Sequence, residues 1–195
     1  MKKRNIMFQD LLTQSFKRCG NTVDVIDFGF IISITGRNRC SNVLEAGTGS
    51  GFLTAHLASY FTEGRVISLE IRRDHFEVAK KNLSQIKLDN IELINQDILT
   101  YTTEPNFFDL ICLDMNDAEK AVTHLFPYLK DGGWFYVYSP YIDGASRIKN
   151  ALTSLGCSYC FAFEPTIREI EVKGNATRLR NIIYGHPHYC VFGRK

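Results

Sequence analysis

Short β-rich apolar runs alternate with amphipathic stretches along the chain from residue 41 onward. The runs have the length of buried strands, and the stretches between them have the 3.6-residue period of helices. We predict strands at residues 42–45, 65–70, 91–94, 109–113 and 134–138. We predict helices at residues 52–61, after Asp74 as N-cap, at 117–129 and at 142–155, the last closed by Gly156. This alternation is typical of a mostly parallel sheet with helices on both faces.

The two ends of the chain depart from this pattern. Before residue 41 we expect two helices, at residues 5–18 and 25–34. After Gly156 the pattern favours two strands, at residues 157–163 and 188–192, joined by a long connection without a convincing helical period. We predict that these strands form an antiparallel pair at the sheet edge. Residues 1–195 are expected to form one α/β domain, with N-terminal helices in residues 1–40 and the sheet in residues 41–195.

Composition and charge are those of an ordinary globular protein. The 195 residues are 45% hydrophobic and 23% charged, and the net charge is +2. That charge does not by itself indicate a nucleic-acid partner. The longest apolar run, residues 28–34, is too short to cross a membrane, and no signal-type segment follows the basic start. We therefore expect a cytoplasmic protein.

The six cysteines show neither a disulfide framework nor the spacing of zinc ligands. Cys157 and Cys160 form a C-x-x-C pair inside a predicted strand, where positions three apart point to opposite faces. No second pair follows at zinc spacing, and none of the five histidines shows ligand spacing. We expect structural cysteines and no metal site.

The sharpest motif is a glycine-rich turn, Gly47-Thr48-Gly49-Ser50-Gly51, between the first predicted strand and the helix that follows. Glycines permit positive φ and let a ligand approach the backbone closely. The helix N-terminus beyond the turn presents unpaired N–H groups. This arrangement suits either a dinucleotide pyrophosphate or the amino-acid end of S-adenosylmethionine.

The spacing of the glycines favours S-adenosylmethionine. The dinucleotide fingerprint G-x-G-x-x-G requires a third glycine where this chain has Phe52. Glu45 stands just ahead of the turn. A carboxylate there would crowd a pyrophosphate, but it can meet the cationic amino group of S-adenosylmethionine directly or through water.

Two further acidic residues follow predicted strands on the same edge. Glu70 ends the second strand, where a carboxylate can accept hydrogen bonds from ribose hydroxyls. Asp97 follows the third strand and can accept from an adenine amino group. A single acidic residue at a strand end is usually a cap or solvated, but three beside a glycine turn indicate a nucleoside site at the carboxyl ends of the strands.

Asp114 is delivered to that edge by the fourth predicted strand. It is either a helix cap or a functional carboxylate. Methylation at N1 leaves adenine positively charged, and a carboxylate that accepts a hydrogen bond from the exocyclic amino group stabilises this charge as it develops. It also orients the base for in-line attack.

With these motifs the sequence resembles the tRNA adenine-N1 methyltransferases, a class I group that acts on the T-loop region. The resemblance runs from residue 21 to 195 and is strongest at residues 43–54, 66–72 and 185–192. It implies a Rossmann-like class I methyltransferase fold and S-adenosylmethionine as cofactor. It assigns the methionine end to Glu45, Gly47, Thr48, Gly49, Ser50 and Leu53, the ribose to Glu70, the adenine side to Asp97, further cofactor contacts to Ile71 and Ile98, and catalysis to Asp114, which also borders the cofactor. Asp27 and Gly29 match a segment that closes over the cofactor.

The chain departs from the family pattern at several positions. Asp114-Met115-Asn116-Asp117 lacks the family's Pro-containing run, and the chain lacks the family's N-terminal β-domain, which is used with RNA. In the tail, Arg178-Leu179 replaces an Arg-Pro and His186-Pro187 a His-Thr. The tail is nevertheless basic, and we expect Arg178, Arg180 and His186 to contact RNA.

The leading hypothesis is methyl transfer from S-adenosylmethionine to N1 of adenine in tRNA. The resemblance implies a homo-oligomer, commonly a tetramer, or a partner subunit that supplies RNA binding. One alternative is methylation of another acceptor, such as protein isoaspartate or a small molecule. Another is a non-catalytic partner subunit that binds S-adenosylmethionine. Hydride transfer by a dehydrogenase is disfavoured by the glycine spacing.

Overall fold

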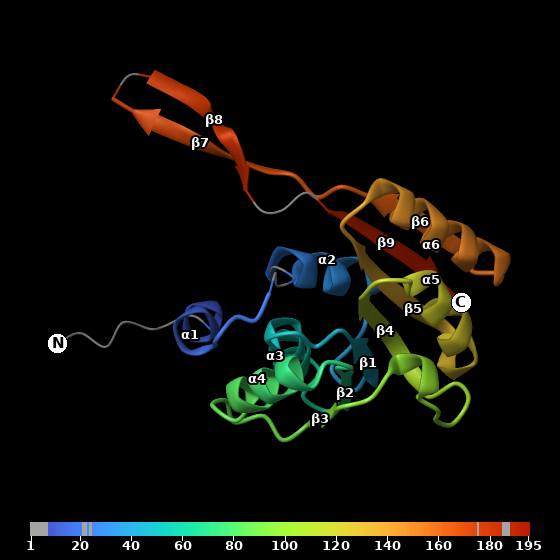
Figure 1. The fold of residues 1–195 in the computed structure, drawn as a ribbon. Coiled ribbons are helices and arrows are strands. Elements are labelled where there is room, and N and C mark those ends of the chain that lie inside the picture. The colour runs from blue at the N-terminus through green and yellow to red at the C-terminus, as the bar shows by residue number, and fades with distance from the viewer. Residues whose placement is uncertain (1–7, 21–22, 24, 175, 185–187) are drawn as a thin grey trace.

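The computed structural model describes residues 8–20, 23, 25–174, 176–184 and 188–195. Its centre is a seven-stranded sheet with the strand order β3-β2-β1-β4-β5-β9-β6 (Figure 1). Strands β1 to β5 are parallel, and β9 runs antiparallel to both β5 and β6. The strands are β1 (Val43–Ala46), β2 (Val66–Leu69), β3 (Ile91–Ile94), β4 (Phe108–Asp114), β5 (Leu129–Ser139), β6 (Tyr159–Phe163) and β9 (Tyr189–Arg194). The predicted mostly parallel sheet with an antiparallel C-terminal pair is confirmed.

Helices cover both faces of this sheet because successive residues of its central strands point to opposite sides. Leu44 and Ile111 pack into one apolar cluster with α5 and α6. Val43 and Leu110 pack into a second cluster with α2 and α3. The helices are α1 (Phe8–Ser15), α2 (Val25–Thr35), α3 (Phe52–Tyr60), α4 (Arg73–Leu83), α5 (Ala118–Leu125) and α6 (Ile142–Ser154), with short 3₁₀ turns η1 (Ile98–Thr100) and η2 (Phe126–Tyr128). No helix in the described part of the chain is long and apolar enough to cross a membrane.

Three details of the sequence prediction were wrong. Asp74 is not the N-cap of α4: the N-cap is Arg72, the helix begins at Arg73, and Asp74 lies in its first turn. The helix predicted at residues 117–129 is shorter, since a 3₁₀ turn that contains Pro127 follows α5. Strand β5 begins at Leu129, because Lys130 to Gly133 continue the strand past a register shift against β4 instead of forming a turn.

The long connection between β6 and β9 contains a β-hairpin that the sequence analysis missed. Strands β7 (Ile167–Lys173) and β8 (Ala176–Tyr184) pair only with each other in a separate two-stranded sheet. Figure 1 shows this hairpin extending away from the body of the protein. A two-stranded ribbon of this kind is only marginally stable alone.

Candidate functional site

A cavity of about 600 Å³ opens at the carboxyl ends of β1, β2 and β4. In parallel α/β sheets this edge is where ligands bind, because loops and helix N-termini converge there. Seven predicted site residues line the cavity: Gly47, Gly49, Glu70, Ile71, Asp97, Ile98 and Asp114. The fold therefore brings the glycine turn and three of the four predicted carboxylates to one space.

The glycine turn has the backbone that its sequence predicts. Gly47, Gly49 and Gly51 have φ values of 89°, 54° and 82°, which side chains rarely tolerate. The turn is anchored to the neighbouring strand, since the N–H groups of Gly47 and Thr48 donate to the Leu69 carbonyl at 2.9 and 3.3 Å. A β-carbon on Gly47 would overlap the backbone of Asp114. The glycines thus bring the main chain against the cavity.

Glu45 is fully buried behind the turn. Its Oε2 accepts hydrogen bonds from Thr54 Oγ1 at 2.6 Å and Ser68 Oγ at 2.7 Å. Burial raises the pKa of this carboxyl to about 7, against the lowering effect of the two hydroxyls. Glu45 does not line the large cavity but a small adjoining one. Contact between Glu45 and a cofactor amino group remains a prediction.

Three further residues expected at the methionine end lie around this small cavity: Thr48, Ser50 and Leu53. The Ser50 hydroxyl accepts from the Cys19 N–H at 2.9 Å. Through this bond it fixes the segment before α2, so that Cys19 and Gly20 line the large cavity. This contribution could not be predicted, because no pattern in the sequence indicates that residues 19–20 pack against the glycine turn.

Glu70 is buried, with 3% of its surface exposed, at the end of β2. Its Oε2 accepts from the Gly49 N–H at 2.8 Å, and its Oε1 accepts from the Arg72 N–H at 3.0 Å. The carboxylate therefore reaches across to the glycine turn while it borders the cavity. A sugar that binds between the turn and β2 would meet this carboxylate.

Asp97, Ile98 and Ile71 form another part of the wall of the large cavity. The Asp97 side chain caps η1 by accepting from the Leu99 N–H at 2.9 Å. Ile98 is buried, whereas Ile71 is 63% exposed at the cavity rim. Two apolar side chains and a carboxylate in one cavity suit a flat heterocycle with an amino group at its edge.

Asp114 is the last residue of β4 and faces both cavities. Burial raises the pKa of its carboxyl to about 6, and the negative charges of Asp27 and Glu70 raise it further, while His188 and Arg72 lower it. Tyr138 of the neighbouring strand β5 and Pro140, just after that strand, also line the cavity. No sequence pattern indicates these two residues, since their position depends on the register of β5.

Of the three residues expected to contact RNA, the structure describes the side chain of Arg178 alone. Arg178 lies on β8 of the hairpin, where its guanidinium pairs with Glu171 at 3.0 Å. Arg180 also lies on β8, but its side chain is outside the described residues, as is the whole of His186. A role of these three residues in RNA binding stays a prediction.

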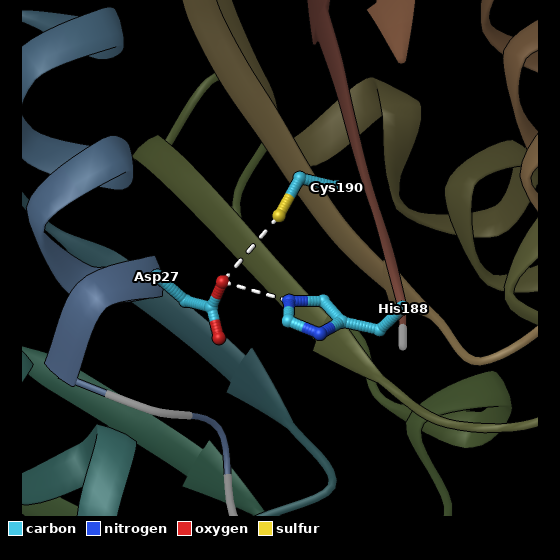
Figure 2. Close-up of side chains that lie close together, drawn as sticks. All are labelled: Asp27, His188 and Cys190. Atoms are coloured by element: carbon cyan, nitrogen blue, oxygen red, sulfur yellow. Dashed lines mark hydrogen bonds and ion pairs between the residues drawn. The ribbon is translucent and has the colours of Figure 1, made fainter. Parts of the chain in front are cut away.

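Asp27 of α2 is buried against the start of β9. Figure 2 shows its carboxylate directed at His188 and Cys190, with hydrogen bonds of 2.8 Å from His188 Nε2 and 3.5 Å from Cys190 Sγ. Gly29, which was predicted to act with Asp27, is exposed and has open space around its α-carbon. All six cysteines are free thiols, including Cys157 and Cys160 of the C-x-x-C pair.

The family profile described as "Methyltransferase domain" matches residues 38–178. The chain belongs to this methyltransferase family. S-adenosylmethionine is the methyl donor of its class I members, and the glycine cradle and the carboxylates around the cavity fit that molecule. The enzyme class and the cofactor predicted from the sequence are thus confirmed.

Known relatives agree with the resemblance seen in the sequence. The chain is 28% identical to tRNA (adenine(57)-N(1)/adenine(58)-N(1))-methyltransferase TrmI of Methanocaldococcus jannaschii, over 94% of this chain and 74% of that protein. It is 33% identical to a protein-L-isoaspartate O-methyltransferase of Methanococcus maripaludis, over 59% of this chain and 55% of that protein. The crystal structure of tRNA (m1A58) methyltransferase TrmI from Aquifex aeolicus superposes with a TM-score of 0.86 at 22% identity, over 97% of this chain and 76% of that one.

Proposed function

We propose that this enzyme transfers the methyl group of S-adenosylmethionine to N1 of an adenine in tRNA, and that residues 1–195 act as one methyltransferase domain. The observation that carries the proposal is the position of Asp114, a largely buried carboxylate at the end of β4 that faces the cavity beside the glycine turn. The similarity to TrmI of Methanocaldococcus jannaschii supports the choice of acceptor.

The residues of the cavity would hold the cofactor in three parts. The backbone of Gly47 and Gly49 would lie against the methionine end, with Thr48, Ser50, Leu53 and Glu45 behind it. Glu70 would accept from the ribose hydroxyls. Asp97 would accept from the adenine amino group, between Ile71 and Ile98. When bound, the cofactor supplies an electrophilic methyl group on a sulfonium.

Asp114 would act on the acceptor base. The bound cofactor would supply its methyl carbon to the lone pair of adenine N1, with the carbon–sulfur bond electrons going to sulfur, so that the base would become cationic beside Asp114. The Asp114 carboxylate accepts a hydrogen bond from the exocyclic amino group, whose acidity rises as this charge develops, so the bond strengthens in the transition state. The raised pKa of about 6 leaves Asp114 mostly ionised at neutral pH, as this role requires.

A second acceptor has a specific observation in its favour. The chain is 33% identical to a protein-L-isoaspartate O-methyltransferase over 59% of its length. A carboxylate acceptor would be repelled by Asp114, whereas a base that becomes cationic is attracted to it. The charge at the end of β4 therefore favours adenine over isoaspartate. A non-catalytic partner subunit is disfavoured because Glu70, Asp97 and Asp114 all line the cavity.

Methyl transfer to separated acceptors tests this proposal. Purified enzyme and labelled S-adenosylmethionine are incubated with unmodified tRNA, with an isoaspartyl peptide, or with a metabolite extract. We expect label in tRNA and 1-methyladenosine among its nucleosides. Asp114→Asn should lower the rate by two or more orders of magnitude, as expected for loss of transition-state electrostatics. The matched control is Asp131→Asn, whose side chain is 93% exposed on β5. If only the peptide were labelled, the acceptor would be isoaspartate and the proposal that tRNA is the acceptor would be wrong.

We also propose that the chain forms a homo-oligomer through the β7–β8 hairpin. Ile170 and Val172 are 63% and 67% exposed, and Leu179 pairs with Ile170 and is 52% exposed. These side chains form an apolar face on a ribbon that no other element covers in the described structure. A second copy is the simplest occupant, since most soluble oligomers are symmetric assemblies of one chain.

A further inference from the structure

Asp27 is one of the most deeply buried charged side chains in the described structure, with 1% of its surface exposed. A carboxylate in that position is costly unless partners satisfy it. It accepts hydrogen bonds from His188 Nε2 at 2.8 Å and from Cys190 Sγ at 3.5 Å (Figure 2). The sequence places Asp27 and His188 161 residues apart. Only the tertiary fold, which packs α2 against the start of β9, brings them together.

The distances in this cluster are those of hydrogen bonds and not of a metal site. One ligand atom from each of Asp27, His188 and Cys190 lies within 4.8 Å of the others, which is close enough to consider an ion. Two ligand atoms about 2.0–2.1 Å from a tetrahedral ion lie roughly 3.3 Å apart, however, because the ion separates them. The 2.8 Å between Asp27 Oδ1 and His188 Nε2 is shorter. Burial also raises the pKa of the Cys190 thiol and so disfavours the thiolate that a metal needs.

The Asp27–His188 pair is connected to the cavity by Tyr138, which contacts His188 and lines the cavity. The imidazole of His188 stacks on the Tyr138 ring, with centroids 4.6 Å apart and planes at 21°. Tyr138 lies beside Asp114 in the parallel register of β4 and β5, and beside Cys190 in the antiparallel register of β5 and β9. Tyr138 also lines the cavity. The pair therefore supports the wall that adjoins the proposed catalytic carboxylate.

The Asp27–His188 pair also contributes to the electrostatic environment of the Asp114 carboxylate. Asp114 faces two other carboxylates, Asp27 from α2 and Glu70 from the end of β2. It faces two basic groups, His188 and Arg72. The Arg72 side chain is 61% exposed and lies 3.7 Å from Glu70, so water screens it, whereas the His188 side chain is only 11% exposed. His188 itself is faced by Asp27, Cys190, Tyr138 and Asp114. A protonated His188 is thus the buried positive charge among three carboxylates.

We propose that His188, held by Asp27, is a positioning residue for methyl transfer, which as an imidazolium fixes Tyr138 by stacking and keeps Asp114 ionised at neutral pH. The inference rests on the proposed function for its catalytic half, and on the fold alone for the protonation of His188. The hydrogen bond to Asp27 and the stacking on an electron-rich phenol both favour the imidazolium. A ring that carries this charge also shields Asp114 from the like charge of Asp27.

The protonation half is tested without cofactor or substrate. The full-length protein is labelled with ¹³C-histidine, and the ring signal of His188 is assigned from its loss in His188→Gln. We expect the imidazolium to persist at pH 7 and its titration to move down by about one pH unit or more in Asp27→Asn. A neutral imidazole at pH 7 would overturn the proposal. Zinc bound at one ion per chain in the purified protein would also overturn it, because the pair would then be a metal site.

The catalytic half is tested on the pH profile of kcat/KM. We expect His188→Gln to move the acid limb up by about one pH unit, which is a roughly tenfold loss of rate on that limb, while the plateau changes less. The control is His124→Gln, because His124 bonds to the Tyr101 carbonyl on the far side of the sheet from this pair. An unmoved acid limb in an active His188→Gln enzyme would overturn the positioning role. Failure of the proposed function is a different result, in which the unaltered enzyme transfers no methyl group.

Discussion

Gly47 in the glycine turn lies directly against Asp114: a β-carbon on the glycine would overlap the Asp114 carbonyl oxygen. Gly47 directly follows β1 and Asp114 ends β4, and these two strands are neighbours in the sheet with Ala46 opposite Leu113. The turn that would hold the methyl donor and the carboxylate that would act on the acceptor are therefore packed as one unit. A change at either residue should affect the other.

Gly47→Ala should strongly destabilise the fold. It combines a φ of 89° with a backbone overlap, so we expect a loss of about 3–5 kcal/mol in the free energy of unfolding, measured by urea denaturation. The control is Gly36→Ala, since Gly36 has a φ of 58° but open space around it. That variant should lose only about 1–2 kcal/mol, the cost of the left-handed conformation. Equal losses in the two variants would show that the contact with Asp114 contributes nothing.

Glu45→Gln should remove a pH dependence of stability. Burial raises the pKa of Glu45 to about 7 in the folded protein from an ordinary value of 4.5. The folded state therefore holds a proton that the unfolded chain has lost, and the free energy of unfolding falls as the pH rises from about 4.5 to about 7. The full effect is at most about 3 kcal/mol. Urea unfolding across pH 4–8 should show a flatter curve for Glu45→Gln but not for the exposed control Glu77→Gln. Identical slopes in wild type and Glu45→Gln would contradict the burial effect.

The rate of methyl transfer should have an acid limb set by Asp114. Its pKa is raised to about 6, so the carboxylate is protonated below that pH and can no longer accept a hydrogen bond from the amino group of the base. We expect kcat/KM to fall about tenfold for each pH unit below 6. Asp114→Asn should abolish this limb together with most of the rate. A profile that is level down to pH 5 would exclude Asp114 as the essential carboxylate.

Charges on the hairpin should disrupt the oligomer. The double variant Ile170→Lys and Leu179→Lys places two positive charges on paired positions of the exposed apolar face. We expect light scattering after size exclusion to give a smaller mass than for the unaltered chain. Tyr159→Lys, on a residue that is 64% exposed at the edge strand β6, is the control and should leave the mass unchanged. An unaltered chain that is already monomeric would refute the oligomer.

The sheet and most of the cavity could be predicted from the sequence because both depend on local patterns. Alternating apolar runs defined the strands, and each predicted carboxylate stands at or just after a strand end, where the chain must leave the sheet. The topology of a parallel sheet then brings Glu70, Asp97 and Asp114 to one edge. These predictions needed no knowledge of side-chain packing.

The features that were missed depend on contacts between distant segments. The β7–β8 hairpin alternates Ile170 and Val172 with polar residues, and Gly174 supplies its turn, so a signal was present within the long connection. The Asp27–His188 pair had no such signal, because its partners are 161 residues apart and meet only when β9 inserts beside β5. Glu45 was predicted to face a ligand amino group, but its hydrogen bonds to Thr54 and Ser68 arise from the packing of α3 and β2.

Calorimetric titration with S-adenosylmethionine tests the central claim most directly, namely that the cavity between the glycine turn and Glu70 holds the methyl donor. We expect one site per chain in the unaltered protein. Glu70→Ala should weaken binding by roughly 10- to 100-fold, since it removes the charged carboxylate that would accept hydrogen bonds from the ribose hydroxyls. Glu77→Ala, on the exposed face of α4, should bind like the unaltered protein. No heat of binding to the folded unaltered chain, or an unchanged affinity in Glu70→Ala, would contradict the account.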